Sequence, residues 1–247
     1  MSKSRKAKLP GFRDFLPEQL ALRNHLFDAW RRVSRRYGFL EYDSPPLEPL
    51  ELYTEKSGPE IVAQLYEFVD KGDRRVALRP EMTPSFARIL GGHSRSMAKP
   101  VRWFSIPHLF RYERQQKGRL REHFQWNVDL VGEEGVEADA EVLAVALDGL
   151  RELGLGPGDV RARVSDRVLL SEILLAQGVA EGKLGSAFAI IDKIERERAE
   201  TLIERLSGPE VGLSPERAES ILDLFRSKGV EAVEAVAAEA EGVSTRL

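Results

Sequence analysis

The sequence predicts an α+β fold in which an antiparallel sheet is flanked by helices and followed by a small helical subdomain. Two patterns carry this prediction. As far as about residue 153, segments with apolar residues at helical spacing occur between short strand-like segments. After a Gly/Pro-rich stretch at residues 154–158, the chain continues as short helical segments separated by glycines.

Composition is that of a globular protein and excludes several kinds of site. The 247 residues are 42% hydrophobic and 31% charged, with a formal net charge of −3. This apolar fraction can fill a core, and the charge excludes a uniformly basic, histone-like protein. The sequence contains no cysteine, which excludes disulfides and thiolate ligands, and its four histidines are too scattered to favour a histidine-rich metal centre.

The sequence predicts no membrane contact and no secretion signal. No apolar run approaches the ~18–20 residues that span a bilayer. The basic N-terminus continues directly into Leu9 and Pro10, without the apolar stretch of a secretory signal. We therefore expect a cytoplasmic protein in which residues 1–8 form a disordered basic arm.

Apolar spacing and breaker residues predict the individual elements. Residues 17–38 predict a helix, because apolar side chains recur every three or four positions up to Gly38. A helix at residues 83–90 would have Thr83 as its N-cap and end at Gly91 and Gly92. The other expected strands and helices lie at residues 39–42, 64–69, 75–78, 101–111, 124–131, 136–153, 168–175, 187–194 and 218–225.

The most informative segment is a basic loop between two expected strands. Five basic side chains fall between Arg111 and Arg121, although the whole chain is slightly acidic. In a hairpin, Arg111, Glu113 and Gln125 would lie on the paired strands, with residues 117–119 at the tip. Guanidinium groups held on strands suit a bidentate grip on phosphate. A charge run alone is more often a solvated edge, but the apolar residues on both flanking strands favour phosphate binding here.

This segment resembles motif 2 of the class II aminoacyl-tRNA synthetases, in the form found in the histidyl-tRNA synthetase family. Other stretches resemble that family in the same order, and the later ones are closest to its organellar and eukaryote-like branch. These stretches are residues 9–17 (LPGFRDFLP), 42–48 (YDSPPLE), 77–84 (ALRPEMTP), 164–167 (VSDR) and 190–193 (IIDK). The resemblance implies a partial class II catalytic core at residues 9–165 and a helical insertion-like subdomain at 166–247.

For the nucleotide, the resemblance implies ATP with Mg²⁺ and a set of basic residues around it. Arg111 would hold the α-phosphate and stabilise the transition state as the histidine carboxylate attacks. Glu113 would accept a hydrogen bond from the adenine amino group, and Arg119, together with Arg121, would reach the outer phosphates. No protein side chain is assigned as a metal ligand.

For the amino acid and the tRNA, the resemblance implies two further sets of contacts. Glu81 and Gln125 would bind the α-ammonium group of histidine, with Thr83 and Arg111 nearby, and Asp129 would face the imidazole. Many family members carry Glu where this chain has Asp129. The tip formed by Lys117 and Gly118 would contact the acceptor end of tRNA-His, and a strand containing Pro45 would form a homodimer interface.

Each of these residues also has a purely structural interpretation. Glu81 could be a carboxylate at a helix entry, Thr83 a helix cap, Gln125 a hydrogen-bonding residue of the sheet, and Asp129 a surface strand residue. Taken singly, these alternatives are at least as good as the functional roles. Four such residues in the family's order favour function.

Three functions remain open at the level of sequence. The first is histidine–tRNA ligase, present here as an N-terminal portion, because motif 3, a second histidine-specific motif and the anticodon-binding domain do not occur in the chain. We therefore expect the chain alone to form histidyl-adenylate poorly. The second is a non-catalytic, histidine-sensing regulatory subunit of ATP phosphoribosyltransferase, and the third is a dimeric scaffold or tRNA-binding relic. Arg111, Glu113 and the Lys-Gly-Arg tip favour the first.

Overall fold

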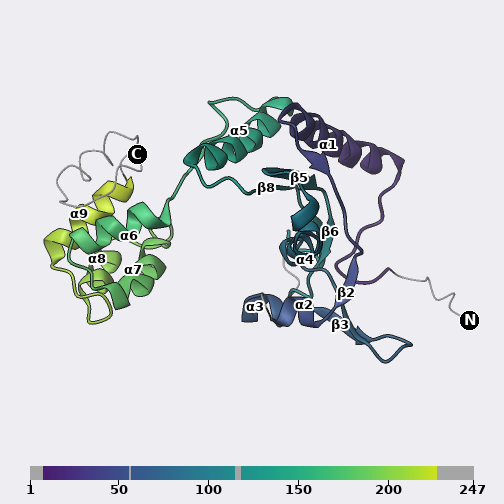
Figure 1. Ribbon diagram of the computed structural model, residues 1–247. Helices are drawn as coiled ribbons and strands as arrows, with labels where there is room; N and C mark the ends of the chain where they lie inside the picture. Colours follow the sequence, from purple (N-terminus) through teal and green to yellow (C-terminus); the bar gives the residue numbers. More distant parts are fainter. Residues whose placement is uncertain (1–7, 56, 115–117, 227–247) are drawn as a thin grey trace, which may run out of the picture. The chain divides into compact units, whose positions relative to one another are not determined.

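The computed structural model describes residues 8–55, 57–114 and 118–226, which divide into two units, Met1–Ala162 and Arg163–Leu247 (Figure 1). The division falls after Ala162, whereas the sequence predicts it after residue 165. Of the basic arm predicted at residues 1–8, only Lys8 lies among the described residues, and it is exposed.

The first unit is organised around a three-stranded sheet with the order β1-β5-β8. Its strands are β1 (Leu40–Glu41), β5 (Val101–Ser105) and β8 (Asn127–Val131). β5 and β8 pair antiparallel, which places Trp103 opposite Asp129. β1 pairs with β5 in parallel, so the sheet is mixed rather than wholly antiparallel. The predicted α+β class is confirmed, with this difference in one strand pairing.

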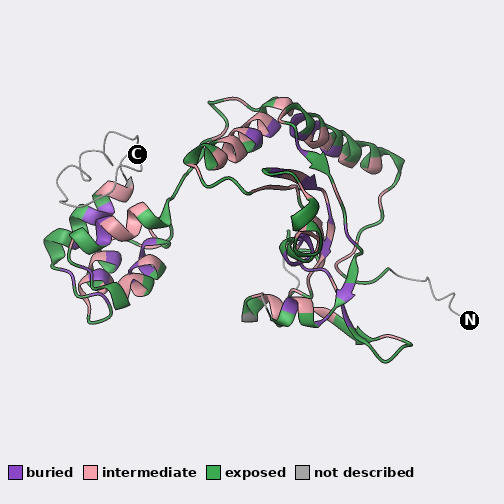
Figure 2. Ribbon diagram, in the orientation of Figure 1, coloured by how far each residue is buried: buried purple, intermediate pink, exposed green. Residues whose placement is uncertain are grey.

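Helices α1 (Pro17–Arg36) and α5 (Val136–Glu152) lie side by side over one face of this sheet (Figure 1). Val33 of α1, Val145 of α5 and Phe104 of β5 belong to one buried cluster with Phe39. Both helices carry buried, partly buried and exposed positions (Figure 2). The predicted apolar stripe of α1 is only partly buried, because Val33 is buried whereas Leu22 is 66% exposed.

Helix α4 (Thr83–His93) packs on the opposite side of β5 through Phe86, whose ring lies 6.2 Å from that of Trp103. Two expectations about this helix are wrong. Thr83 is the first helical residue, the N-cap is Met82, and no side chain caps the helix. Gly91 and Gly92 lie within the helix, because a glycine costs only about 1 kcal/mol in a helix interior and does not end it by itself.

A second sheet has the order β2-β4-β3, with strands β2 (Leu47–Pro49), β3 (Tyr66–Val69) and β4 (Arg75–Leu78). β3 and β4 pair antiparallel and confirm the predicted hairpin. The Asp70 carboxylate accepts from the backbone N–H groups of Gly72 and Arg74, which closes the loop. Two short helices, α2 (Glu51–Thr54) and α3 (Pro59–Val62), follow β2.

Three predicted strands differ from the structure. The stretch at residues 101–111 is divided into β5 and β6 (His108–Phe110) at Pro107, which has no N–H to continue a ladder. The stretch at 124–131 is divided between β7 (Glu122–Phe124) and β8. Pro45 is exposed and lies between β1 and β2 rather than within a strand.

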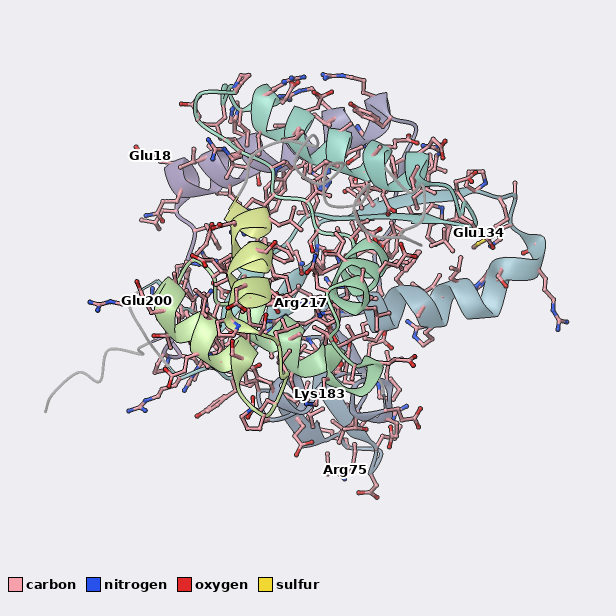
Figure 3. The ribbon with its side chains drawn as sticks, turned by 90° about the vertical axis from the view of Figure 1, so that its left-hand side faces the viewer. Glu18, Arg75, Glu134, Lys183, Glu200 and Arg217 are labelled. Carbon is pink, nitrogen blue, oxygen red and sulfur yellow. The ribbon has the colours of Figure 1, made fainter. Side chains whose placement is uncertain are left out.

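The second unit is helical, as predicted for this part of the chain. Its elements are α6 (Arg167–Ala176), η2 (Glu181–Lys183), α7 (Leu184–Ile191), α8 (Ala199–Ser207) and α9 (Pro215–Arg226). A separate core of leucine, isoleucine, valine and alanine side chains holds these helices together. Lys183 donates to the carbonyl of Pro209 and Arg217 to that of Gln177, so these two cations, labelled in Figure 3, connect separate parts of this unit.

Candidate functional site

A short hairpin presents the basic segment that the sequence singles out. β6 and β7 pair antiparallel, with His108 opposite Phe124 and Phe110 opposite Glu122. The N–H of Arg111 still donates to the carbonyl of Arg121, at 3.0 Å, but the N–H of Tyr112 turns away to the carbonyl of Gln64. β6 therefore ends at Phe110, and β7 covers only residues 122–124. The predicted placement of Arg111, Glu113 and Gln125 within paired strands is wrong.

The half-buried side chain of Arg111 is held beside the segment that carries Glu81. Its Nε donates to the carbonyl of Pro80 at 3.0 Å, and the N–H of Phe110 donates to the carbonyl of Arg79. Pro80 directly precedes Glu81, whose Oε1 accepts from the Ser57 hydroxyl at 2.6 Å. Arg111 and Glu81, thirty residues apart in sequence, thus lie close together in the fold.

Four of the predicted site residues line one cavity of about 870 Å³. They are Arg111, Glu113, Gly118 and Arg119. Arg13 and Arg23 of the N-terminal segment line the same cavity, which gives it an excess of positive charge suited to a polyanion. Arg119 and Glu113 form a 3.4 Å ion pair, and because the Arg119 side chain is 65% exposed, this pair contributes little to stability.

Arg121 is engaged elsewhere in the same segment. Its guanidinium carbon lies 3.8 Å from the centroid of the Tyr112 ring, and its Nε donates to the carbonyl of Glu113. The aliphatic stem of Arg121 covers Gly11, where an added Cβ would lie 2.8 Å from Cγ. Gly118 has φ +85°, a backbone conformation that favours glycine, and Lys117 lies outside the described residues.

Thr83 and Asp129 line a second cavity, of about 310 Å³. Its wall also includes Asn127, the first residue of β8, Trp126 directly before it, and Val142 of α5. Thr83 is exposed, whereas Asp129 is partly buried. The structure therefore brings these two predicted residues together around a volume suited to a small ligand.

The carboxylate of Asp129 contacts one tyrosine. The Tyr42 hydroxyl donates to Asp129 Oδ2 at 3.4 Å. Burial raises the pKa of Asp129, and the hydrogen bond from Tyr42 opposes that rise. Burial and the Asp129 charge in turn raise the pKa of the Tyr42 phenol. The sequence motif around Pro45 contains Tyr42, but its pattern gives no sign of this pairing.

Gln125 is exposed in the connection between β7 and β8, and its N–H donates to the carbonyl of Pro107 at 3.3 Å. Gln125 and Arg121 line neither cavity, and the other predicted residues lie in two groups. Arg111, Glu113 and Arg119 share the larger cavity, with Glu81 next to Arg111 through Pro80, and Thr83 and Asp129 share the smaller one.

Sequence reasoning missed a buried carboxylate within the basic segment. Glu122 accepts from the N–H and Nε of Arg13 at 2.9 and 3.1 Å, and its second oxygen lies 2.8 Å from Nε2 of His108. Burial alone would raise the pKa of Glu122, but the hydrogen bonds from Arg13 and His108 outweigh it and lower that pKa. A side-chain exposure of 3% distinguishes Glu122 from the solvated charges around it. The sequence gives no signal for this burial, because it predicts the strand only from residue 124 onward.

Two histidines beside the site are held towards their neutral forms. Burial lowers the pKa of His108, and the Glu122 carboxylate only partly opposes this. Burial also lowers the pKa of His123, and the positive charge of Arg111 adds to the effect. His123 lines the larger cavity together with Arg111. The charge of Arg111 therefore also affects the protonation of His123, a residue for which the sequence predicts no role.

Among the described residues, no group of three or more His, Asp or Glu side chains could hold a metal ion. Mg²⁺ commonly uses one or two carboxylates and substrate phosphates rather than a complete protein cage, so the Glu113 side of the larger cavity is compatible with a phosphate-borne ion. Within the same residues, no helix has both the length and the apolar character needed to cross a bilayer.

Comparisons with known proteins agree on one family. The family model described as "Histidyl-tRNA synthetase" matches residues 11–209. A histidine–tRNA ligase of Opitutus terrae is 50% identical over 188 residues, covering 76% of this chain and 43% of the relative. The chloroplastic/mitochondrial histidine–tRNA ligase of Arabidopsis thaliana is 42% identical over 224 residues, covering 91% and 46%. The chain spans about half the length of the curated relatives it matches.

Solved structures support the fold. The histidyl-tRNA synthetase of Nostoc sp. PCC 7120 superposes with a TM-score of 0.83 at 24% identity, covering 98% of this chain and 55% of that one. A Bacillus halodurans protein named as an ATP phosphoribosyltransferase regulatory subunit/histidyl-tRNA synthetase gives 0.79 at 21% identity, covering 100% and 62%. At these identities the two structures show a shared fold alone.

Proposed function

Because the chain belongs to the histidyl-tRNA synthetase family, we propose that its first unit binds ATP and histidine for the activation step of a histidine–tRNA ligase. In that step a carboxylate oxygen of histidine attacks the α-phosphorus of ATP. The bond to the β-phosphate breaks, pyrophosphate leaves with the electron pair, and histidyl-adenylate forms. Transfer of the histidyl group to tRNA-His would complete the reaction.

The placement of Arg111 is the observation that carries this proposal. Its guanidinium lines the larger cavity and also reaches the carbonyl of Pro80, next to Glu81. A fixed cation between a polyanion cavity and an ammonium-binding carboxylate can contact both reactants. Charge develops on the α-phosphoryl oxygens in the transition state, where a rigid guanidinium stabilises it most.

For ATP, we assign Glu113 to the adenine amino group and Arg119 to the outer phosphates. The Arg119 side of the ion pair with Glu113 is exposed, so the pair is weak enough for both side chains to be released to a ligand. Arg121 remains the second proposed phosphate residue, and to reach a phosphate it would leave the ring of Tyr112. Mg²⁺ would be carried on the phosphates of ATP.

For histidine, we assign Glu81 and Gln125 to the α-ammonium group, with Thr83 nearby, and Asp129 to the imidazole. An ionised carboxylate only accepts hydrogen bonds, so Asp129 would select a ring N–H donor. The position of Thr83 and Asp129 at one 310 Å³ cavity supports the assignment of a small side chain to that place.

The wider organisation is also proposed. The first unit would be a partial class II catalytic core and the helical unit an insertion-like subdomain, with Lys117 and Gly118 contacting tRNA-His. A homodimer would use the segment at Pro45, which is flanked by the exposed side chains of Leu40 and Leu47. An organellar-like branch and a cytoplasmic location stay predictions, since the plant relative is 42% identical, an archaeal one 43% and a bacterial one 50%.

Calorimetric titration of the 247-residue chain with L-histidine tests the amino-acid site directly. We expect saturable binding that Glu81→Gln weakens about tenfold or more, because a hydrogen bond to a charged group is lost. Glu67→Gln is the matched control, since Glu67 is an exposed carboxylate on β3. Absence of histidine binding, or equal loss in both variants, would remove the support for this site.

Binding of tRNA separates the ligase from a histidine-sensing regulatory subunit. The curated relatives at up to 50% identity are named histidine–tRNA ligases, so the regulatory reading has less support. A synthetase segment should retain tRNA on filters with an affinity that falls steeply as salt rises, since phosphate contacts release counterions. A chain that binds histidine but shows no salt-dependent tRNA binding would favour the regulator.

A further inference from the structure

We propose that Tyr42 is a positioning residue for imidazole recognition. Its phenol holds Oδ2 of Asp129, which leaves Oδ1 to accept a hydrogen bond from the imidazole N–H of histidine. This inference rests on the proposed function, which places histidine against Asp129. It extends that function to Tyr42, the residue that directly follows β1.

The backbone and ring of Tyr42 are both fixed. Its N–H donates to the carbonyl of Phe104 at 2.9 Å, directly beyond the pairing of β1 with β5. Its ring centroid lies 5.3 Å from that of Trp103 and 5.4 Å from that of Phe86. Contacts with these two rings restrict the χ angles of Tyr42, which fixes the position of its hydroxyl oxygen.

Asp129 is brought to this hydroxyl by the register of the sheet. Asp129 lies on β8 opposite Trp103 of β5, and the ring of Tyr42 contacts the ring of the same Trp103. The Tyr42 hydroxyl lies 3.4 Å from Asp129 Oδ2. That separation is long for an O–H···O bond, and such contacts in ligand-free sites commonly tighten when a substrate binds.

Electrostatics give the contact a role beyond packing. Burial favours the neutral form of Asp129, and Tyr42 is the hydrogen-bond donor, within the described part of the chain, that acts against burial. An ionised carboxylate can only accept, whereas a protonated one presents an O–H that competes with the imidazole N–H. Removing the phenol hydroxyl should therefore change both the orientation and the charge state of Asp129.

The test uses Tyr42→Phe in the 247-residue chain, which keeps the ring and removes the hydroxyl. Two quantities are measured: the dissociation constant for L-histidine by calorimetry, and the titration of the Asp129 carboxyl carbon by NMR. We expect the dissociation constant to rise about tenfold at neutral pH, as for loss of one hydrogen bond to a charged group, and the Asp129 titration to move to higher pH.

Specificity supplies a readout that simple destabilisation would not move. L-β-(2-thienyl)alanine has a five-membered ring without an N–H, so the wild-type chain should prefer L-histidine over it. Tyr42→Phe should reduce that preference by the same factor as it reduces histidine affinity. In Asp129→Asn, adding Tyr42→Phe should have no further effect, since the two residues act through one contact.

Tyr37→Phe is the matched control. Tyr37 also donates its hydroxyl to a carboxylate, Oδ2 of Asp148 at 2.7 Å, where α1 meets α5, and it does not line the smaller cavity. The Tyr37→Phe substitution should leave histidine affinity and selectivity unchanged. An equal loss in Tyr37→Phe, or an unchanged affinity and Asp129 titration in Tyr42→Phe, overturns the role of Tyr42 while wild-type histidine binding keeps the proposed function. If the wild-type chain binds no histidine, the proposed site and this inference both fail.

Discussion

The carboxylate of Glu122 joins His108 to Arg13, which lies 109 residues before Glu122 in the sequence. One oxygen accepts from both the backbone and the side chain of Arg13, and the other contacts the His108 ring. This contact fastens the segment before α1 to the hairpin that presents Arg111. The position of the candidate phosphate-binding cation thus depends on a buried charge of the same hairpin.

Glu122→Gln should lower the free energy of unfolding by about 2 kcal/mol, because charge-assisted hydrogen bonds to a buried carboxylate become neutral ones. Urea unfolding at pH 7 measures the change. Glu51→Gln, an exposed carboxylate in the first turn of α2, should change the unfolding free energy by no more than about 0.5 kcal/mol. Similar losses of unfolding free energy in both variants would show that the contacts of Glu122 make no specific contribution to stability.

Stability should fall as the pH decreases from 7 to 5. The pKa values of His108 and His123 are both lowered from an ordinary value of 6.5. Below that value the unfolded chain binds protons that the folded chain does not, so unfolding is favoured. The lowered pKa of Glu122 acts in a separate window, since its contribution is present above 4.5 and is lost as the pH falls through its folded value.

Urea midpoints measured at pH 8, 7, 6 and 5 test the histidine effect. The double variant His108→Gln, His123→Gln should show a smaller decrease between pH 7 and 5 than the wild type. At pH 8 both histidines are neutral in either state, so the two proteins should differ there only by a constant offset. Parallel curves over the whole range would contradict the prediction.

Gly149→Ala should destabilise the chain by about 1–3 kcal/mol, although alanine is the better helix former. An added Cβ would lie 2.8 Å from Cη2 of Trp126, whose ring is stacked on that of Trp30 at 5.7 Å and 8°. Gly91→Ala in α4 is the control, because no atom lies within 4 Å of its added Cβ. It should be neutral or stabilising by up to about 1 kcal/mol, and thermal unfolding of both variants would reveal opposite signs.

Arg111→Ala should weaken ATP binding by about 10- to 100-fold, the range expected when a charged hydrogen-bond donor is removed. Arg114→Ala removes the same charge from an exposed position of the same segment and should change affinity by less than about twofold. Calorimetry at one fixed ionic strength compares the two variants. Equal weakening in both would indicate that general positive charge, rather than the placement of Arg111, attracts the nucleotide.

Local patterns predicted the helices and the β3–β4 hairpin because apolar spacing and turn residues act over a few positions. The same patterns were wrong in two details. Thr83 looked like a cap, yet it begins α4 without one. Residues 101–111 looked like one strand, yet the missing N–H of Pro107 and the pairing with two different partners divide it.

The sequence by itself determined the α+β class, the family and the identity of the candidate site residues, because these depend on residue types and their order. Only the tertiary structure decided that Arg111 lies against Pro80, that Tyr42 contacts Asp129 and that Glu122 is buried between Arg13 and His108. Three of these contacts join residues 31, 87 and 109 positions apart in the chain. Sheet register and side-chain burial set them, and no local spacing encodes either quantity.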